Sequence, residues 1–214
     1  AKVAATRGYG AHVVFCPPTH MGRHEVAARV GAETGAAFVH PHDDLRVIAG
    51  QGTAVWELIE EAGPLDLILA PVGGGGLLSG TLTAARHLLP RVGVIGCEPE
   101  QADDAARSLQ TGILVTDFVP RTLADGLRTP LGEHAFEILR RHVDGIVTVS
   151  EREIVDAMRI VWERAKLLIE PSSAVAVAPL LAGKVDAGGK RGGVILSGGN
   201  VDLAGFFATL QGAV

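Results

Sequence analysis

Cysteine is scarce in this chain, and its scarcity excludes two kinds of architecture. The 214 residues hold two cysteines, Cys16 and Cys97, far apart and in no metal-binding spacing. A disulfide framework or a structural zinc site needs more cysteines at closer spacing. We therefore expect two reduced cysteines, a cytoplasmic protein, and a fold that depends on its hydrophobic core.

Long apolar runs and clusters of basic residues are absent too. No stretch reaches the roughly 18 uninterrupted apolar residues of a membrane-spanning helix, and no secretory signal pattern is visible. With 19 basic and 24 acidic residues the formal charge is −5, and no basic run could follow a nucleic-acid backbone. The sequence predicts a protein that binds neither nucleic acid nor membrane.

What the chain does contain is an alternation of apolar strands and helical stretches. Its 47% hydrophobic content and 28 glycines are typical of a well-packed globular protein with many backbone turns. The strands are expected at 12–16, 37–40, 65–72, 92–97, 145–149 and 192–196. The helices are expected at 24–34, 48–62, 77–89, 102–109, 131–142, 151–168, 173–181 and 202–210. This order predicts an α/β fold, with a mostly parallel sheet and helices on both faces.

One stretch stands out, where an apolar run from Leu65 enters four successive glycines. Gly73–Gly76 are followed by Leu77, which opens an apolar-periodic segment without a breaker. Glycines let the backbone approach a ligand closely, and a helix N-terminus offers free N–H groups and a positive dipole end. The stretch therefore predicts a phosphate or other anion site; a tight but empty turn is the alternative.

Polar or glycine-rich clusters follow other predicted strands as well. Glu98 ends the strand 92–97, and Ser197–Asn200 follows the strand 192–196. In open α/β sheets ligands bind outside the carboxyl ends of strands. We therefore expect the glycine stretch and these clusters to contribute to one site.

Two common phosphate motifs fit the glycine stretch poorly. A P-loop needs a lysine and a Ser or Thr after its glycines, where Leu77 and Leu78 stand here. A dinucleotide fingerprint counted from Gly73 or Gly74 meets Leu78 or Ser79 where a glycine or alanine is required. Glu98, about twenty residues on, is where a ribose-binding acid would lie. A dinucleotide-binding Rossmann-type domain therefore stays open as an alternative.

A third possibility, pyridoxal phosphate, is supported by several motifs in a fixed order. The chain resembles the family of serine racemases and threonine (serine) dehydratases, which have the tryptophan-synthase-β-like fold of type II pyridoxal-phosphate enzymes. The segments that carry the resemblance run along essentially the whole chain: 47–53 (VIAGQGT), 73–77 (GGGGL), 124–126 (ADG), 168–172 (LIEPS) and 196–202 (LSGGNVD).

The resemblance implies a set of cofactor-binding residues. Gly73, Gly74, Gly75 and Gly76 would surround the cofactor phosphate together with the Leu77 amide. The Ser197 hydroxyl would meet the pyridine nitrogen; a hydroxyl holds that nitrogen protonated less firmly than a carboxylate would. Gly126, Glu170 and Gly198 would lie near the ring. Without the other motifs, Ser197 would be read as a turn residue and Glu170 as an exposed helix-end acid.

The resemblance also implies a divalent cation, Mg²⁺, Ca²⁺ or Mn²⁺. Metal-dependent members bind it through residues that match Glu98, the Ala102 carbonyl and Asp104. Two carboxylates, a carbonyl and waters suit hard cations, whose role here would be structural or allosteric. The alternative is that Glu98 and Asp104 cap the helix that begins near Ala102.

Two further residues are candidates for contact with a small amino-acid substrate. Thr129 follows Gly126 closely, and Arg23 aligns with an arginine that some members use on the substrate carboxylate. An exposed arginine at a helix start is the alternative for Arg23. His40 and His42 flank Pro41 without metal partners in sequence, and we interpret them as loop residues.

The catalytic lysine of the family has no counterpart here. Its motif and the adjoining Ser-x-Gly-Asn-His loop are missing, and none of the four lysines, Lys2, Lys166, Lys184 and Lys190, has the right context. The sequence lacks an initiating methionine, and we expect a fragment without the N-terminal third of the enzyme. Without an amine nucleophile the chain alone would be inactive. A catalytically dead module that binds the cofactor or another anion is the alternative.

For the full-length parent the resemblance implies dehydration of L-threonine or L-serine to a 2-oxo acid and ammonia. Serine racemisation is the second activity in the family, and the residues that decide between the two lie outside this chain. Residues 1–45 would be the remainder of a small domain and 46–214 the large cofactor-binding domain. The family also implies a homodimer.

Overall fold

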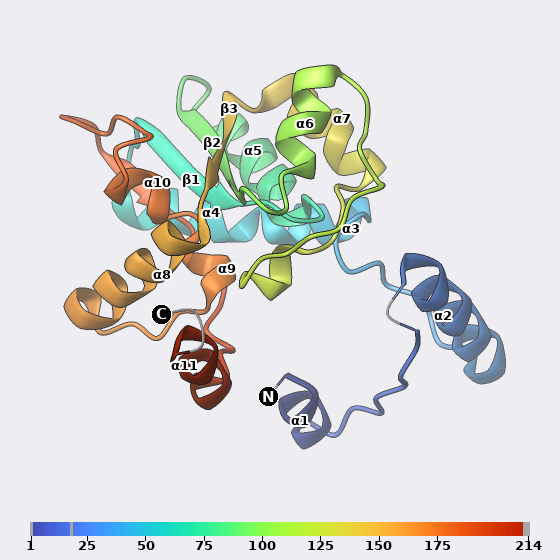
Figure 1. Ribbon diagram of the computed structural model, residues 1–214. Helices are drawn as coiled ribbons and strands as arrows, with labels where there is room; N and C mark the ends of the chain where they lie inside the picture. The colour runs from blue at the N-terminus through green and yellow to red at the C-terminus, as the bar shows by residue number, and fades with distance from the viewer. Residues whose placement is uncertain (1, 18, 212–214) are drawn as a thin grey trace. The chain divides into compact units, whose positions relative to one another are not determined.

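The computed structural model describes residues 2–17 and 19–211 and contains two compact units (Figure 1). One unit is Pro41–Gly199, and the other joins Ala1–His40 with Asn200–Val214. The assignment of residues 1–45 to a small domain and 46–214 to a large one stays a prediction.

A parallel sheet forms the centre of the unit Pro41–Gly199. Its strands are β1 (Leu67–Pro71), β2 (Gly93–Pro99), β3 (Gly145–Val149) and β4 (Gly192–Val194), in the order β3-β2-β1-β4. All three strand pairs are parallel, with Leu67 opposite Gly93 and Gly192 in register. The predicted α/β fold with a parallel sheet is therefore confirmed, and the segments that follow the strands meet at one edge of the sheet.

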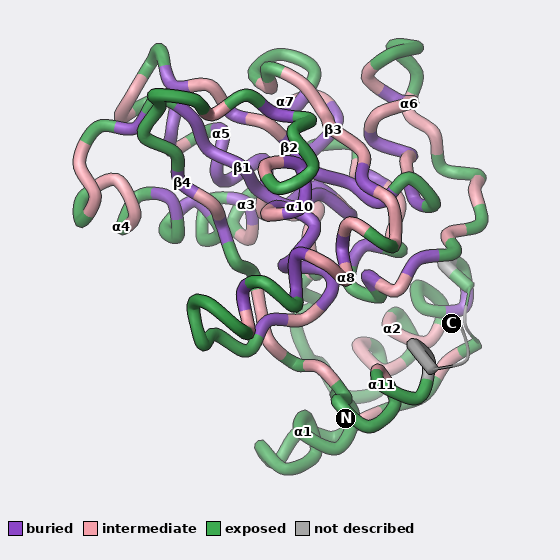
Figure 2. Tube along the Cα trace, turned by 60° about the vertical axis from the view of Figure 1, so that its left-hand side comes forward, coloured by how far each residue is buried: buried purple, intermediate pink, exposed green. Residues whose placement is uncertain are grey.

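Strand β1 is buried on both of its faces, as Figure 2 shows for the middle of the sheet. Ile68 and Ala70 belong to the main core cluster, together with Leu78 and Leu82 of α5 (Gly76–Leu88). Leu69, which points to the opposite face, is also fully buried. A parallel strand that is apolar on both faces needs helices on both sides, which explains its continuous apolar run.

The other helices of this unit follow the predicted order with changed boundaries. They are α3 (Leu45–Gln51), α4 (Thr53–Ala62), α6 (Asp104–Thr111), α7 (Glu133–His142), α8 (Glu151–Ile160), α9 (Pro171–Ala174) and α10 (Ala178–Leu181), with a short 3-10 turn at Asp125–Leu127. The predicted helix 48–62 is divided at Gly52. A Cβ on Gly80 of α5 would lie 2.3 Å from the Ile48 carbonyl oxygen and 2.5 Å from the Gly52 nitrogen. The two glycines therefore let this break pack directly on α5.

Helix α8 begins as predicted but ends early. The Ser150–Glu153 capping box is present, with both reciprocal bonds formed. After Ile160 the chain continues as a π-helix, Val161–Ala165, and then leaves the helix at Lys166, which has a positive φ of 59°. Trp162 donates its indole N–H to the Ile169 carbonyl at 3.0 Å. The prediction of one helix over 151–168 is therefore wrong: the helical backbone ends at Lys166, and the Trp162 bond connects the π-helix to the segment that follows it.

The smaller unit is helical in its described part. It contains α1 (Lys2–Gly8), α2 (His20–Thr34) and α11 (Leu203–Gln211). The predicted strands 12–16 and 37–40 are wrong, because both segments are extended without a ladder partner among the described residues. A strand exists only when another strand accepts and donates its backbone hydrogen bonds.

Candidate functional site

The glycine stretch forms the turn between strand β1 and helix α5. Gly75 is the N-cap of α5 and has a left-handed φ of 87°. The first helical bond runs from the Ser79 amide to the Gly75 carbonyl, so the amides of Gly76, Leu77 and Leu78 precede it and have no acceptor within the helix. These amides and the helix dipole make the turn a suitable place for an anion.

The packing around this turn leaves no room for side chains on its glycines. A Cβ on Gly74 would lie 2.3 Å from the His42 ring, and one on Gly75 would lie 2.5 Å from Leu131 and 2.6 Å from Ala135. Contacts this short force the neighbours to move. The glycines are therefore required by the close approach of the surrounding chain as well as by the φ of Gly75.

His42, which the sequence places in a loop, lies at the candidate site. Its ring lies against Gly74, and its backbone oxygen would be 2.6 Å from a Cβ on Gly76. The next residue, Asp43, accepts the amides of Glu133 and Ala135 at 3.0 and 3.2 Å and so caps α7. In the sequence, the only indication of this contact is that His42 follows a predicted strand, because the residues that it contacts are distant in sequence.

The segment 124–132 lies beside the glycine turn. The Gly126 carbonyl oxygen would be 3.3 Å from a Cβ on Gly73, and the Gly126 amide donates to Ser172 Oγ at 3.0 Å. The Gly132 amide donates to the Gly74 carbonyl at 3.1 Å. The structure thus brings Gly126 next to the turn, while Thr129 is half-buried in the same segment.

Ser197 and Gly198 follow strand β4, the neighbour of β1. Ser197 is exposed, and its hydroxyl lies 3.3 Å from the hydroxyl of the fully buried Ser173. The Glu170 amide donates to the Gly198 carbonyl at 3.1 Å, and a Cβ on Gly198 would be 2.7 Å from Glu170 Oε1. Glu170 and Ser197 therefore belong to one cluster, which also contains Ser173, a residue that no sequence motif indicated.

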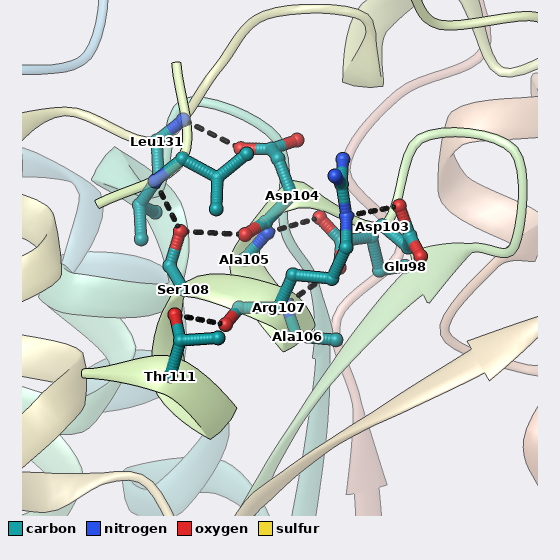
Figure 3. Close-up of polar contacts among 10 residues, drawn as sticks. Glu98, Asp103, Asp104, Ala105, Ala106, Arg107, Ser108, Thr111 and Leu131 are labelled. Atoms are coloured by element: carbon teal, nitrogen blue, oxygen red, sulfur yellow. Dashed lines mark hydrogen bonds and ion pairs between the residues drawn. The ribbon is translucent and has the colours of Figure 1, made fainter. Parts of the chain in front are cut away.

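The acidic pair consists of Glu98, in strand β2, and Asp104, the first residue of α6. Both residues are fully buried, and Figure 3 shows their polar contacts. Glu98 accepts the amides of Ala105 and Ala106 at 3.0 Å each, which caps the start of α6. Asp104 Oδ2 accepts the Leu131 amide at 2.8 Å. Asp104 Oδ1 is buried and has no hydrogen-bond partner among the described residues.

Burial sets the electrostatics of this pair. It raises the pKa of Glu98 to about 8, with a further contribution from the nearby charge of Asp104. It also raises the pKa of Asp104 to about 6, opposed by the hydrogen bond from Leu131. Two buried carboxylates whose ionised forms are disfavoured, one with an unused oxygen, fit a cation as a neighbour.

The observed contacts bear on both interpretations of the acidic pair. Glu98 does cap α6, as the helix-capping alternative holds, whereas Asp104 bonds outside that helix. Within the described residues no group of three His, Cys, Asp or Glu side chains could hold a metal ion. The Ala102 carbonyl, from a residue that is 1% exposed, would have to be the third protein ligand. The same contacts argue against a dinucleotide site, because both Glu98 oxygens are engaged with α6.

The remaining candidates are an arginine of the smaller unit and three lysines. Arg23 is exposed on α2, in the smaller unit. Lys184 binds Glu100 and Glu153, and Lys190 donates to the Asp186 carbonyl. Lys166 is exposed at the end of the π-helix, so none of these three lysines contacts the glycine turn.

None of the described helices combines the length and the apolar character needed to span a bilayer.

Both cysteines are free thiols, and burial raises the pKa of Cys97 to about 12.

Comparisons with known proteins agree on one family. Residues 1–198 match the family described as "Pyridoxal-phosphate dependent enzyme". The β-hydroxyaspartate dehydratase of Paracoccus denitrificans (strain Pd 1222) is 48% identical over 203 residues, which are 95% of this chain and 64% of the relative. The chain thus spans just under two thirds of that relative's length.

Solved structures give the same picture. The serine racemase of Dictyostelium discoideum superposes with a TM-score of 0.87 at 45% identity, over 94% of this chain and 66% of the other. A threonine deaminase from T.th. superposes with a TM-score of 0.88 at 47% identity, over 94% of this chain and 67% of the other. The predicted family and fold are both confirmed by these similarities.

Proposed function

Because the chain belongs to the family of pyridoxal-phosphate dependent enzymes, we propose that the whole protein eliminates water from a β-hydroxy-α-amino acid. The products are a 2-oxo acid and ammonia. The observation that carries the proposal is the pairing of the glycine turn after β1 with the Ser197 hydroxyl after the adjacent strand β4. One end of that arrangement suits a phosphate and the other suits a ring nitrogen.

The residues of this chain divide the binding of pyridoxal phosphate between them. The amides of Gly73–Gly76 and Leu77 hold the phosphate, and Ser197 meets the ring nitrogen. Gly126, Glu170 and Gly198 line the ring. His42, which contacts Gly74, closes one side of the phosphate site. When bound, the cofactor withdraws electrons from the substrate α-carbon.

Substrate choice within the β-hydroxy-α-amino acids is a separate part of the proposal. L-Threonine and L-serine are the substrates implied by the resemblance, and 3-hydroxyaspartate joins them because the Paracoccus relative is named for it. Thr129 and Arg23 are the candidate substrate contacts on this chain. Serine racemisation is the accompanying activity to be tested.

A divalent cation is the second part of the proposal. Glu98, the Ala102 carbonyl and Asp104 would hold Mg²⁺, Ca²⁺ or Mn²⁺, and the unused Asp104 Oδ1 supports this. The ion would neutralise two buried carboxylates and stabilise the fold around α6. The test compares the thermal unfolding midpoint in MgCl₂ with that in EDTA. The unaltered protein is expected to have a higher midpoint in MgCl₂, whereas Asp104→Asn is expected to have the same midpoint in both buffers. Equal midpoints for the unaltered protein in the two buffers would overturn the metal site.

The activity test compares the full-length protein with this chain. Full-length protein with pyridoxal phosphate is expected to release 2-oxo acid from at least one of L-threonine, L-serine and L-threo-3-hydroxyaspartate. This chain alone should bind the cofactor without turnover, because the lysine of the family is missing from it. A full-length protein that forms neither oxo acid nor D-serine would contradict the proposal and favour a binding module. A homodimer and a cytoplasmic location stay predictions.

A further inference from the structure

A lysine outside the cofactor site connects three elements near the acidic pair. Lys184 lies in the turn after α10, and its side chain is 33% exposed. Its ammonium group donates to three oxygens, the Thr148 carbonyl at 3.0 Å, Glu153 Oε2 at 2.8 Å and Glu100 Oε1 at 3.3 Å. An ammonium group has three protons, one for each of these acceptors. Lys184 therefore joins the end of strand β3, the first turn of helix α8 and the chain that leaves strand β2.

The backbone on both sides of the Lys184–Glu100 ion pair is anchored. The Lys184 amide donates to the Pro179 carbonyl at 2.9 Å, which ties the lysine to α10. The Glu100 amide donates to the Val149 carbonyl at 2.8 Å, so Glu100 continues the pairing of β2 with β3. Because both ends are anchored, this ion pair orders less of the chain than an ordinary exposed pair does.

Glu100 belongs to the turn that leads from Glu98 to Asp104. The Ala102 amide donates to the Pro99 carbonyl at 2.9 Å, which closes a tight turn between them. Glu98 directly precedes this turn, Ala102 ends it, and Asp104 follows two residues later. The three proposed cation ligands therefore lie before, within and after a turn whose second residue is the partner of the lysine.

We propose that Lys184 is a positioning residue for the divalent-cation site. By holding Glu100, it fixes the turn that carries the Ala102 carbonyl. A cation that takes its ligands from a preformed turn does not have to order that turn on binding, so its affinity is higher. The inference rests on the cation site proposed above and adds to it a residue that does not bind the ion itself.

The charge of Lys184 and its hydrogen bonds act on the cation in opposite directions. An ammonium group repels a divalent cation, so removal of the charge alone would strengthen cation binding. Removal of the hydrogen bonds would release the turn and weaken cation binding. The charge effect is the smaller of the two, because Lys184 is paired with Glu100 and Glu153 and is partly open to solvent. The direction of the change in a neutral variant therefore shows whether positioning dominates.

The test measures Mg²⁺ binding by calorimetric titration of the full-length protein loaded with pyridoxal phosphate. Lys184→Met should raise the dissociation constant about three- to tenfold, less than the roughly 10–100-fold found when a group that directly holds a metal ligand is removed. Lys190→Met is the matched control, because Lys190 lies in the same loop and donates to the Asp186 carbonyl. It should leave the dissociation constant unchanged. Both variants remove one positive charge, so the difference between them reports the contacts of Lys184.

A second neutral variant, Lys184→Gln, is measured beside Lys184→Met so that the test does not depend on the folding of one variant. Unchanged or tighter Mg²⁺ binding in a folded neutral variant would overturn the positioning role, even if its unfolding midpoint in EDTA were lower. That result would mean that Lys184 serves the fold alone. Absence of Mg²⁺ binding by the unaltered protein would instead refute the cation site of the proposed function.

Discussion

Asp104 Oδ2 accepts the Leu131 amide at 2.8 Å, and this bond joins the acidic pair to the glycine turn (Figure 3). The next amide, that of Gly132, donates to the Gly74 carbonyl at 3.1 Å. Leu131 also packs its side chain against Gly75. The two candidate sites are therefore linked through the two-residue segment Leu131–Gly132.

The metal-free protein should lose stability as the pH rises from 5 to 8. The pKa of Glu98 is raised from 4.5 to about 8 and that of Asp104 from 3.8 to about 6, so the folded state binds protons more tightly than the unfolded state. This contribution is complete below the unfolded pKa values and is lost as the pH passes the folded ones. Urea unfolding in EDTA at both pH values measures it. Glu98→Gln is the control and should reduce the slope; an identical slope would contradict the assignment.

Gly75→Ala should destabilise the protein more than Gly112→Ala. Both glycines have a left-handed φ, 87° and 72°, and share its cost of about 1–2 kcal/mol in free energy of unfolding. Gly112 faces open space, whereas a Cβ on Gly75 meets Leu131 and Ala135 and adds about 1–3 kcal/mol of overpacking. Denaturant unfolding of the two variants gives the difference. Equal losses would mean that the turn can move away from Leu131.

Asp43→Ala should cost about 0.5–2 kcal/mol of unfolding free energy, the range for a helix N-cap. Its carboxylate accepts the amides of Glu133 and Ala135, and its side chain is only 15% exposed. Asp103→Ala is the control: Asp103 pairs with Arg107 on the surface, and such pairs contribute about 0.5 kcal/mol or less. Similar midpoints for the two variants would count against the capping role of Asp43.

Trp162→Phe should destabilise the protein by about 1–3 kcal/mol, because the Ile169 carbonyl loses its donor in a residue that is 4% exposed. Trp56→Phe is the matched change, since the Trp56 indole bonds Glu60 on an exposed helix face. Trp56→Phe should lower the free energy of unfolding, measured in urea, by less than half as much as Trp162→Phe. If Trp56→Phe lowered the free energy of unfolding more than Trp162→Phe did, the Trp162 indole bond would not be important for the turn after the π-helix.

Local signals were sufficient for the elements that carry the glycine turn. The run 65–72, the glycines and the periodic segment after Leu77 predicted β1, the turn and α5, and the structure contains all three. The capping box at Ser150 was also confirmed, because its two partners are three residues apart. Such features depend on residues that are close in sequence, so a sequence pattern is sufficient to predict them.

The predictions that were wrong and the residues that were missed depend on contacts between distant parts of the sequence. The strands predicted at 12–16 and 37–40 failed because strand formation depends on a partner elsewhere in the chain. His42 and Ser173 were missed because their partners, Gly74 and Ser197, are more than twenty residues away. No pattern of spacing encodes these contacts.

The sequence by itself determined the family, the parallel α/β plan and the glycine turn, since each is written in short ordered motifs. Only the tertiary structure decided which hydrogen-bond partner each buried polar group has. It assigned Glu98 to the start of α6, Asp104 to Leu131, and Ser173 to the backbone of Gly198. These assignments arise because buried donors and acceptors must find partners, and folding places those partners far apart along the chain.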